Sequence, residues 1–163
     1  STGDWSSDVC SSDLNNMNKV YWGLREQAFL ITPQAIGIYL ESNEQVFAAV
    51  VDIPVGGKTV TMFCSFDGTV SLYYSNGKCD IGLGEKENIR KATMSFLISS
   101  GQCLKFMDLY ENNIIIQKSM QIFLFSKNGI KTQKICIDSL KTKEEKFLNF
   151  MVQNILSEIR TNQ

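Results

Sequence analysis

The chain has 163 residues, a formal net charge of −1 and no histidine. A near-neutral charge does not favour a strongly charged partner such as nucleic acid. The lack of histidine excludes Ser-His-Asp and Cys-His nucleophilic sites and histidine-ligated metals. No stretch approaches the run of about 18 apolar residues that a membrane-spanning helix needs, which argues against a membrane protein.

The N-terminal segment reads Asp4-Trp5-Ser6-Ser7-Asp8-Val9-Cys10-Ser11-Ser12-Asp13-Leu14. It resembles one reading frame of a widely used high-throughput sequencing adapter. We therefore treat residues 1–14 as a non-native tail, outside the fold, and residues 15–163 as a single domain. Met17 is a candidate start, and an upstream truncation fits equally well. With Met17 as the start, the absence of a signal-peptide core predicts a cytoplasmic protein.

A short amphipathic helix is predicted over Val20–Ile31, because Leu24, Ala28 and Ile31 fall on one face. Thr32-Pro33 ends it, since the residue before proline disfavours helical backbone. The apolar residues 35–40 that follow predict either an edge strand or a packed loop.

Three consecutive strands are predicted at Val46–Ile53, Lys58–Phe66 and Thr69–Ser75. The first is a nearly continuous apolar run, typical of a central strand. The other two alternate with a period of two, which places Thr61 and Ser71 on the outer face and is typical of an antiparallel sheet covered mainly on one face. The turns between them are Pro54-Val55-Gly56-Gly57 and Asp67-Gly68. Asp-Gly predicts a type I′ hairpin, which requires positive φ at both central residues.

A long helix is predicted from Glu85 to Met107, with apolar residues three and four positions apart. Gly101 interrupts this stripe, and indicates either a close approach to the sheet or an early end of the helix. Residues 120–125 and 130–137 flank a Lys-Asn-Gly turn and predict a second hairpin.

Thr142 and Glu145 form a capping-box pattern that opens the last helix. Its predicted buried stripe is Leu148, Met151, Val152, Ile155 and Ile159. The element order α-βββ-α-ββ-α predicts a two-layer α+β fold, with one five-stranded, mainly antiparallel sheet and helices packed on it.

Four cysteines lie outside the tail: Cys64, Cys79, Cys103 and Cys136. None forms a CxxC pair, and all but Cys79 sit at apolar positions of predicted elements, so we predict buried, reduced thiols and no metal site. Cys79-Asp80 is the best candidate for an exposed thiol, but a neighbouring carboxylate raises a thiol pKa and no base is available to activate it. We therefore predict no catalytic residue and no cofactor.

Gly82-Leu83-Gly84 precedes the long helix and has two interpretations. Free amides at a helix start attract phosphate, which suggests a nucleotide- or phosphometabolite-binding domain. The pattern is neither GxxxxGK[ST] nor GxGxxG, however, and Glu85 and Glu87 place negative charge where a phosphate would lie. A turn that brings helix and sheet close together is the favoured interpretation.

The second predicted hairpin carries Lys127, Lys131 and Lys134. A basic ribbon can bind nucleic acid, but interleaved arginines and aromatic residues are missing. Lysines that protect a sheet edge are the commoner explanation, so a nucleic-acid partner is disfavoured.

Three motifs carry a resemblance: Asp52-Ile53-Pro54-Val55-Gly56, then Asp67-Gly68-Thr69-Val70-Ser71-Leu72-Tyr73, then Ile81-Gly82-Leu83-Gly84 before Ile89-Arg90-Lys91-Ala92. Through them, residues 46–100 resemble a group of short uncharacterised bacterial proteins. The resemblance implies a bacterial, cytoplasmic, single-domain protein and carries no activity. The architecture also looks like the roadblock, longin and profilin-like scaffolds, which bind partners.

We therefore predict a small non-enzymatic module that binds another protein or regulates it, with toxin-neutralising (immunity) proteins as one sub-case. The predicted partner-binding residues lie in three turns: Pro54, Gly56, Gly57, Asp67, Gly68, Cys79, Asp80, Gly82 and Gly84.

Overall fold

The computed structural model describes residues 12–112, 115 and 118–162. Within them the chain forms an α+β fold with three α-helices and one antiparallel sheet of seven strands. The α-helices are α1 (Ser12–Phe29), α2 (Glu87–Ser100) and α3 (Lys143–Thr161). The strands are β1 (Val46–Val55), β2 (Lys58–Ser65), β3 (Val70–Tyr74), β4 (Cys79–Asp80), β5 (Asp108–Leu109), β6 (Met120–Ser126) and β7 (Gly129–Ile135). Short 3-10 helices are η2 (Gln34–Ile36), η3 (Leu83–Glu85), η4 (Gly101–Phe106) and η5 (Ile137–Ser139).

The sheet order is β4-β3-β2-β1-β6-β7-β5, which places the meander of β1, β2 and β3 beside the hairpin of β6 and β7. β1 is the central strand, as predicted, and pairs with both β2 and β6. Residues 48–51 of this strand are fully buried. Continuous apolar sequence therefore reflects burial on both faces of the sheet.

The predicted five strands correspond to β1, β2, β3, β6 and β7, and the count of five is wrong. β4 adds to β3 at one edge, and β5 adds to β7 at the other. Each has only two residues, so neither leaves a periodic pattern in the sequence. Very short edge strands also limit the backbone that a sheet edge exposes.

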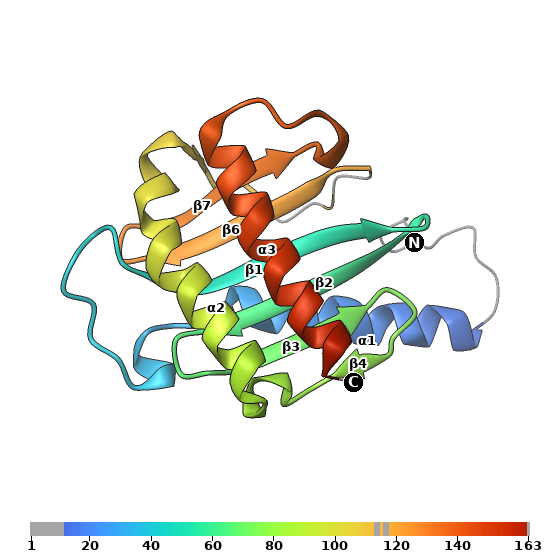
Figure 1. Ribbon diagram of the computed structural model, residues 1–163. Coiled ribbons are helices and arrows are strands. Elements are labelled where there is room, and N and C mark those ends of the chain that lie inside the picture. The colour runs from blue at the N-terminus through green and yellow to red at the C-terminus, as the bar shows by residue number, and fades with distance from the viewer. Residues whose placement is uncertain (1–11, 113–114, 116–117, 163) are drawn as a thin grey trace.

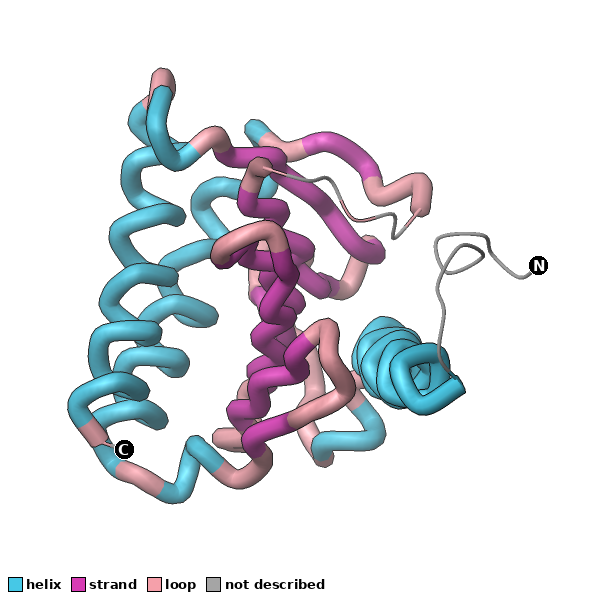
Figure 2. The backbone as a smooth tube through the Cα atoms, turned by 90° about the vertical axis from the view of Figure 1, so that its right-hand side faces the viewer, coloured by secondary structure: helices cyan, strands magenta, loops and turns pink. Residues whose placement is uncertain are grey.

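The prediction of two layers is also wrong, because helices cover both faces of the sheet. α2 and α3 lie on one face and α1 lies on the other (Figures 1 and 2). Met62 and Cys64 of β2 point into the core under α2 and α3, whereas Phe63 belongs to a second core under α1. Thr61 and Ser71, expected on an outer face, are buried beneath α1.

α1 runs over Ser12–Phe29, so it begins eight residues before the predicted Val20. The predicted start is too late, because the apolar positions that indicated the helix, Leu24, Ala28 and Ile31, lie in its C-terminal half or just beyond it. Residues 34–40 form η2 and a loop rather than an edge strand, and Leu40 is buried against the core under α1.

The two meander turns differ from each other. Gly56 and Gly57 have φ of 56° and 79°, the positive values of a type I′ turn. In the second turn only Gly68 has positive φ, at 95°, so the predicted type I′ geometry for Asp67-Gly68 is wrong. The Ser65 amide bonds to the Thr69 carbonyl and the Gly68 amide to the Ser65 carbonyl, which closes a three-residue loop with glycine in its last position.

The long predicted helix is divided. η3 and α2 are separate, and α2 gives way to η4 at Gly101. A Cβ at Gly101 would lie 2.1 Å from the carbonyl oxygen of Glu44, so the glycine permits close approach to the loop before β1. The last helix matches its prediction: Thr142 accepts from the Glu145 amide, and all five expected stripe residues of α3 are buried.

Candidate functional site

The turn between β2 and β3 meets the η3 turn beside the first turn of α2. The two turns line a hollow of about 400 Å³. We call this region the Arg90 corner and define it as Asp67, Gly68, Ile81, Gly82, Gly84, Glu85 and Arg90. It contains four of the nine residues that the sequence singled out for partner binding, and they come from segments that lie about 15 residues apart in the chain.

Direct backbone contact holds the corner together. A Cβ at Gly84 would lie 1.8 Å from the carbonyl oxygen of Gly68, so no side chain fits there. Gly84 is buried although it lies in a surface turn. The favoured interpretation of this glycine, close packing of the turn before the helix, is therefore confirmed.

Arg90 fixes the same contact from the helix side. Its Nη1 donates to the Gly84 carbonyl oxygen at 2.9 Å. Its Cδ lies 3.3 Å from the position that a Gly68 Cβ would take, so the side chain covers that glycine. Sequence analysis missed Arg90 as a site residue, because an arginine beside the buried stripe of a helix is ordinarily solvated. Its position six residues after the close-packed Gly84 was the available clue.

Asp67 organises the β2–β3 turn with its carboxylate. Oδ1 accepts from the Ser65 hydroxyl at 2.6 Å and from the Thr69 amide at 3.0 Å. Burial opposes ionisation of this group, but the hydrogen bonds from Ser65 and Thr69 outweigh burial and lower its pKa below the ordinary 3.8. Asp67 is therefore a carboxylate at neutral pH.

Charge in the corner is only partly compensated. Among the described residues, no lysine or arginine nitrogen lies within 4.0 Å of the Asp67 or Glu85 carboxylate. Arg90 donates to a backbone carbonyl rather than to either acid. The hollow therefore presents two carboxylates without an ion-pair partner, next to the side chain of Ile81, which is 64% exposed.

The geometry bears on the phosphate interpretation of Gly82-Leu83-Gly84. Leu83 and Gly84 belong to η3, Gly82 caps its start, and the extended residue Lys86 separates η3 from α2. The Glu85 carboxylate lies 3.3 Å from the Cβ position of Gly82, and it lines the same hollow as Asp67. A phosphate there would meet negative charge on two sides. Nucleotide binding stays a prediction.

Cys79 and Asp80 lie in β4, on the strand that leads into Ile81. Cys79 is exposed, and Asp80 accepts from the Tyr74 hydroxyl at 2.7 Å. Burial, followed by this bond to Asp80, raises the pKa of Tyr74 to about 12. Cys79 and Asp80 line a separate hollow of about 600 Å³ at the β3–β4 turn. They adjoin the Arg90 corner but do not form part of it.

Pro54, Gly56 and Gly57 lie elsewhere. They form the tip of the β1–β2 hairpin, at the opposite end of β2 from Asp67 (Figure 1). The structure therefore divides the nine predicted residues among the hairpin tip, the β4 edge and the Arg90 corner. Only the corner joins two of the predicted turns.

Comparison with protein-family models, curated proteins and solved structures finds no match to this chain. The resemblance to short bacterial proteins therefore stays a prediction. Within the described residues, no helix is long and apolar enough to cross a membrane, and no three side chains of Cys, Asp or Glu group so as to hold a metal ion.

Proposed function

We propose that this chain is a small cytoplasmic protein-binding module and that the Arg90 corner is its contact with the partner. One observation carries the proposal: the exposed side chain of Ile81 stands beside two carboxylates, Asp67 and Glu85, that have no ion-pair partner among the described residues. Protein interfaces combine an apolar centre with charges that the partner complements.

The rigidity of the corner favours recognition. The Gly84 backbone packs directly on the Gly68 carbonyl, and the Arg90 guanidinium bonds to Gly84. A contact surface that is already ordered loses little conformational entropy when a partner binds. The hydrogen bonds to Asp67 also fix the direction of its carboxylate before binding.

The chemistry of the corner specifies the partner segment. A large apolar side chain would pack on Ile81, and a lysine or arginine would pair with Asp67 and Glu85. Each such charged contact would act mainly on specificity and association rate. The expected ligand is therefore a loop or extended segment with a basic residue next to an apolar one.

Selection from a displayed library of random peptides tests this proposal. We expect enrichment of sequences in which lysine or arginine neighbours a large apolar residue. Fluorescence polarisation with a selected peptide should then show at least tenfold weaker binding to Glu85→Lys and Ile81→Ser, because tenfold is about 1.4 kcal/mol.

Matched controls lie on a distant part of the surface. Glu111→Lys changes charge as Glu85→Lys does, and Leu109→Ser removes an apolar side chain that is 68% exposed. Both should bind the peptide as the parent chain does. Selected peptides without basic residues, or equal loss in the controls, would contradict the proposal. Thermal stabilisation by a nucleotide, abolished by Arg90→Ala, would favour the alternative function instead.

A further inference from the structure

Two buried polar atoms under α1 have no hydrogen-bond partner among the described residues: Nη1 of Arg25 and Oε1 of Gln121. The two residues are 0% and 7% exposed, so bulk solvent does not reach them. A buried polar atom without a partner is costly, and nearly all such atoms in proteins bond to a protein group or to an ordered water. One of these atoms is a donor and the other an acceptor, so their requirements are complementary.

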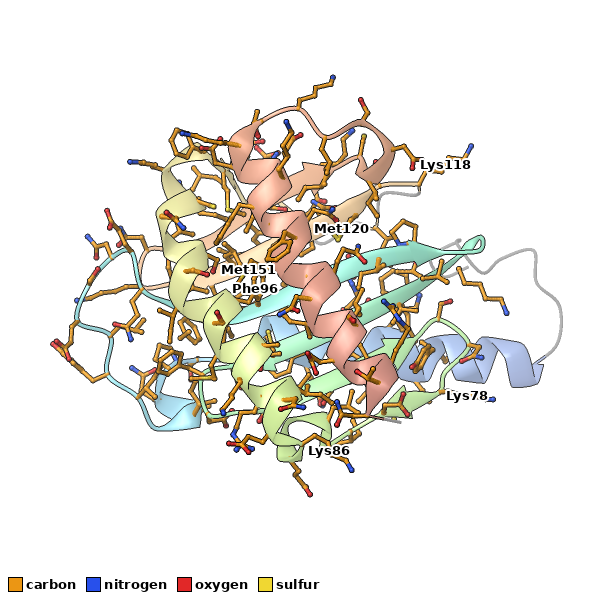
Figure 3. All side chains as sticks on the ribbon, in the orientation of Figure 1. Lys78, Lys86, Phe96, Lys118, Met120 and Met151 are labelled. Atoms are coloured by element: carbon orange, nitrogen blue, oxygen red, sulfur yellow. The ribbon has the colours of Figure 1, made fainter. Side chains whose placement is uncertain are left out.

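The two atoms lie in the same place on the sheet. Met120 points into the core under α2 and α3 (Figure 3), so Gln121, the next residue of β6, points to the face under α1. Gln121 lies directly opposite Asp52 of β1, which places their Cβ atoms about 5 Å apart. Asp52 holds the Arg25 guanidinium, whose Cζ also lies 5.8 Å from the ring centre of Phe123 in β6. The guanidinium therefore spans β1 and β6 beside Gln121.

The orientation of both groups leaves the two atoms facing one region. Nε2 of Gln121 donates to Oγ1 of Thr132 in β7 at 3.0 Å. Because β7 and β1 flank β6 on opposite sides, this bond turns Oε1 toward β1 and Arg25. Asp52 takes two of the five N–H donors of the guanidinium, and neither belongs to Nη1. Three aromatic rings have their centres within 5.8 Å of Cζ: Trp22, Phe29 and Phe123.

We propose that a buried water molecule bridges Nη1 of Arg25 and Oε1 of Gln121 beneath α1. The water accepts from Nη1 and donates to Oε1, and one water spans two polar atoms up to about 6 Å apart. The charges around the site select this occupant. A cation would meet the guanidinium, and an anion would meet Oε1 and the carboxylate of Asp52. A small neutral molecule that both accepts and donates satisfies both atoms.

The water extends the polar contacts of α1 across the sheet. Direct bonds place Arg25 on Asp52 of β1, which also accepts from Thr61 of β2 at 2.7 Å. The water joins Arg25 to Gln121 of β6, which in turn bonds to Thr132 of β7. One hydrogen-bonded row then crosses four strands and ties α1 to the β6–β7 hairpin as well as to the meander. The proposal uses no residue of the Arg90 corner.

A high-resolution crystal structure and NMR of the full chain test the proposal. We expect an ordered water about 2.7–3.2 Å from each of the two atoms. We also expect a rotating-frame NOE between a water and the guanidinium protons of Arg25, since the sign of this effect separates proximity from proton exchange. A direct bond from Nη1 to Oε1 or to any other protein atom would overturn the proposal, and so would a turned amide with Oε1 on Thr132.

A matched pair of variants tests the part played by Gln121. Gln121→Met keeps the length of the side chain and removes the acceptor. We expect the NOE to Arg25 to disappear and the folding equilibrium constant from urea unfolding to fall about tenfold, because a buried donor loses its bridge. Gln153→Met is the control, since Gln153 belongs to α3 on the other face of the sheet. It should keep the NOE and change the folding constant by less than about twofold. An NOE that survives Gln121→Met would overturn the bridge, and the parent chain alone decides the proposal if that variant does not fold.

Discussion

Arg25 of α1 holds Asp52 of β1 in a buried bidentate ion pair beneath the helix. Nε and Nη2 donate to the two carboxylate oxygens at 3.1 and 2.6 Å, and the side chains are 0% and 2% exposed. Thr61 donates to the same carboxylate, and the Tyr21 hydroxyl contacts Thr61. Burial, followed by the charge of Asp52, raises the pKa of Tyr21 to about 12. This polar cluster fixes where α1 sits on the sheet.

The ion pair specifies position more than it adds stability. Desolvation of both charges offsets most of their attraction, and Arg25 Nη1 and Gln121 Oε1 have no hydrogen-bond partner among the described residues. The guanidinium also lies 5.0 Å from the ring centre of Phe29, so aromatic faces surround the charge. An apolar contact alone would allow α1 several positions along the sheet. The two hydrogen bonds from Arg25 to Asp52 form in only one of those positions.

Removing one partner of this pair should be far worse than removing both. We expect Arg25→Met to cost about 3–5 kcal/mol of unfolding free energy, because it leaves the Asp52 charge buried without a partner. The double variant Arg25→Met/Asp52→Leu should recover most of that loss. Urea unfolding followed by circular dichroism measures both. Arg160→Met, at an exposed site on α3, should change stability by less than about 0.5 kcal/mol. Equal losses in the double and single variants would contradict this account.

The backbone contact in the Arg90 corner predicts a steric effect of one methyl group. Gly84→Ala places Cβ against the Gly68 carbonyl, which is backbone and must shift, so we expect a loss of about 1–3 kcal/mol. Gly23→Ala is the matched control, since α1 leaves open space around Gly23. That change should stabilise the helix by up to about 1 kcal/mol. Thermal and urea unfolding would show the two substitutions acting in opposite directions; the same sign in both would refute the contact.

Strong periodicity explains which elements were predictable. β1, β2, β3, β6, β7 and α3 each carry an apolar pattern over several residues, and their places in the chain match the predictions. β4 and β5 are too short to have a period, and their pairing depends on where neighbouring loops fall. Local sequence therefore accounts for the five long strands and leaves the edges undetermined.

The second core shows a different limit. Thr61 and Ser71 alternate with apolar residues, which normally indicates a solvated face. They are buried because α1 brings its own polar side chain, Arg25, to that face. No pattern in the α1 sequence marks an arginine as buried. The sequence therefore did not predict that α1 forms a third layer on the second face of the sheet. Likewise, Arg90 gains its role only when two distant turns meet beside it.

The Asp67 carboxylate predicts a stability effect with a defined pH dependence. Its folded pKa lies below 3.8, so its contribution is fully present above that value and is lost as the pH falls through the lower folded pKa. Asp67→Asn keeps the acceptor oxygen and removes the charge. We expect the variant to be less stable than the parent at neutral pH and the difference to shrink on acidification below about pH 4. Urea midpoints over a pH series measure it. A difference that grows toward low pH would show the sign to be wrong.

Thiol reactivity should follow the burial of the four described cysteines. Cys79 and Cys136 are exposed, although the sequence placed Cys136 at an apolar position, while Cys64 and Cys103 are buried. Burial raises the pKa of Cys64 to about 12, so little thiolate exists to react. In a time course with iodoacetamide, read by peptide mass spectrometry, Cys79 and Cys136 should be labelled first and Cys64 only as the chain unfolds. All four should react similarly in urea. Labelling of Cys64 at the rate of Cys79 in the native chain would show that the Cys64 side chain does not lie in a closed core between the sheet and the α2–α3 layer.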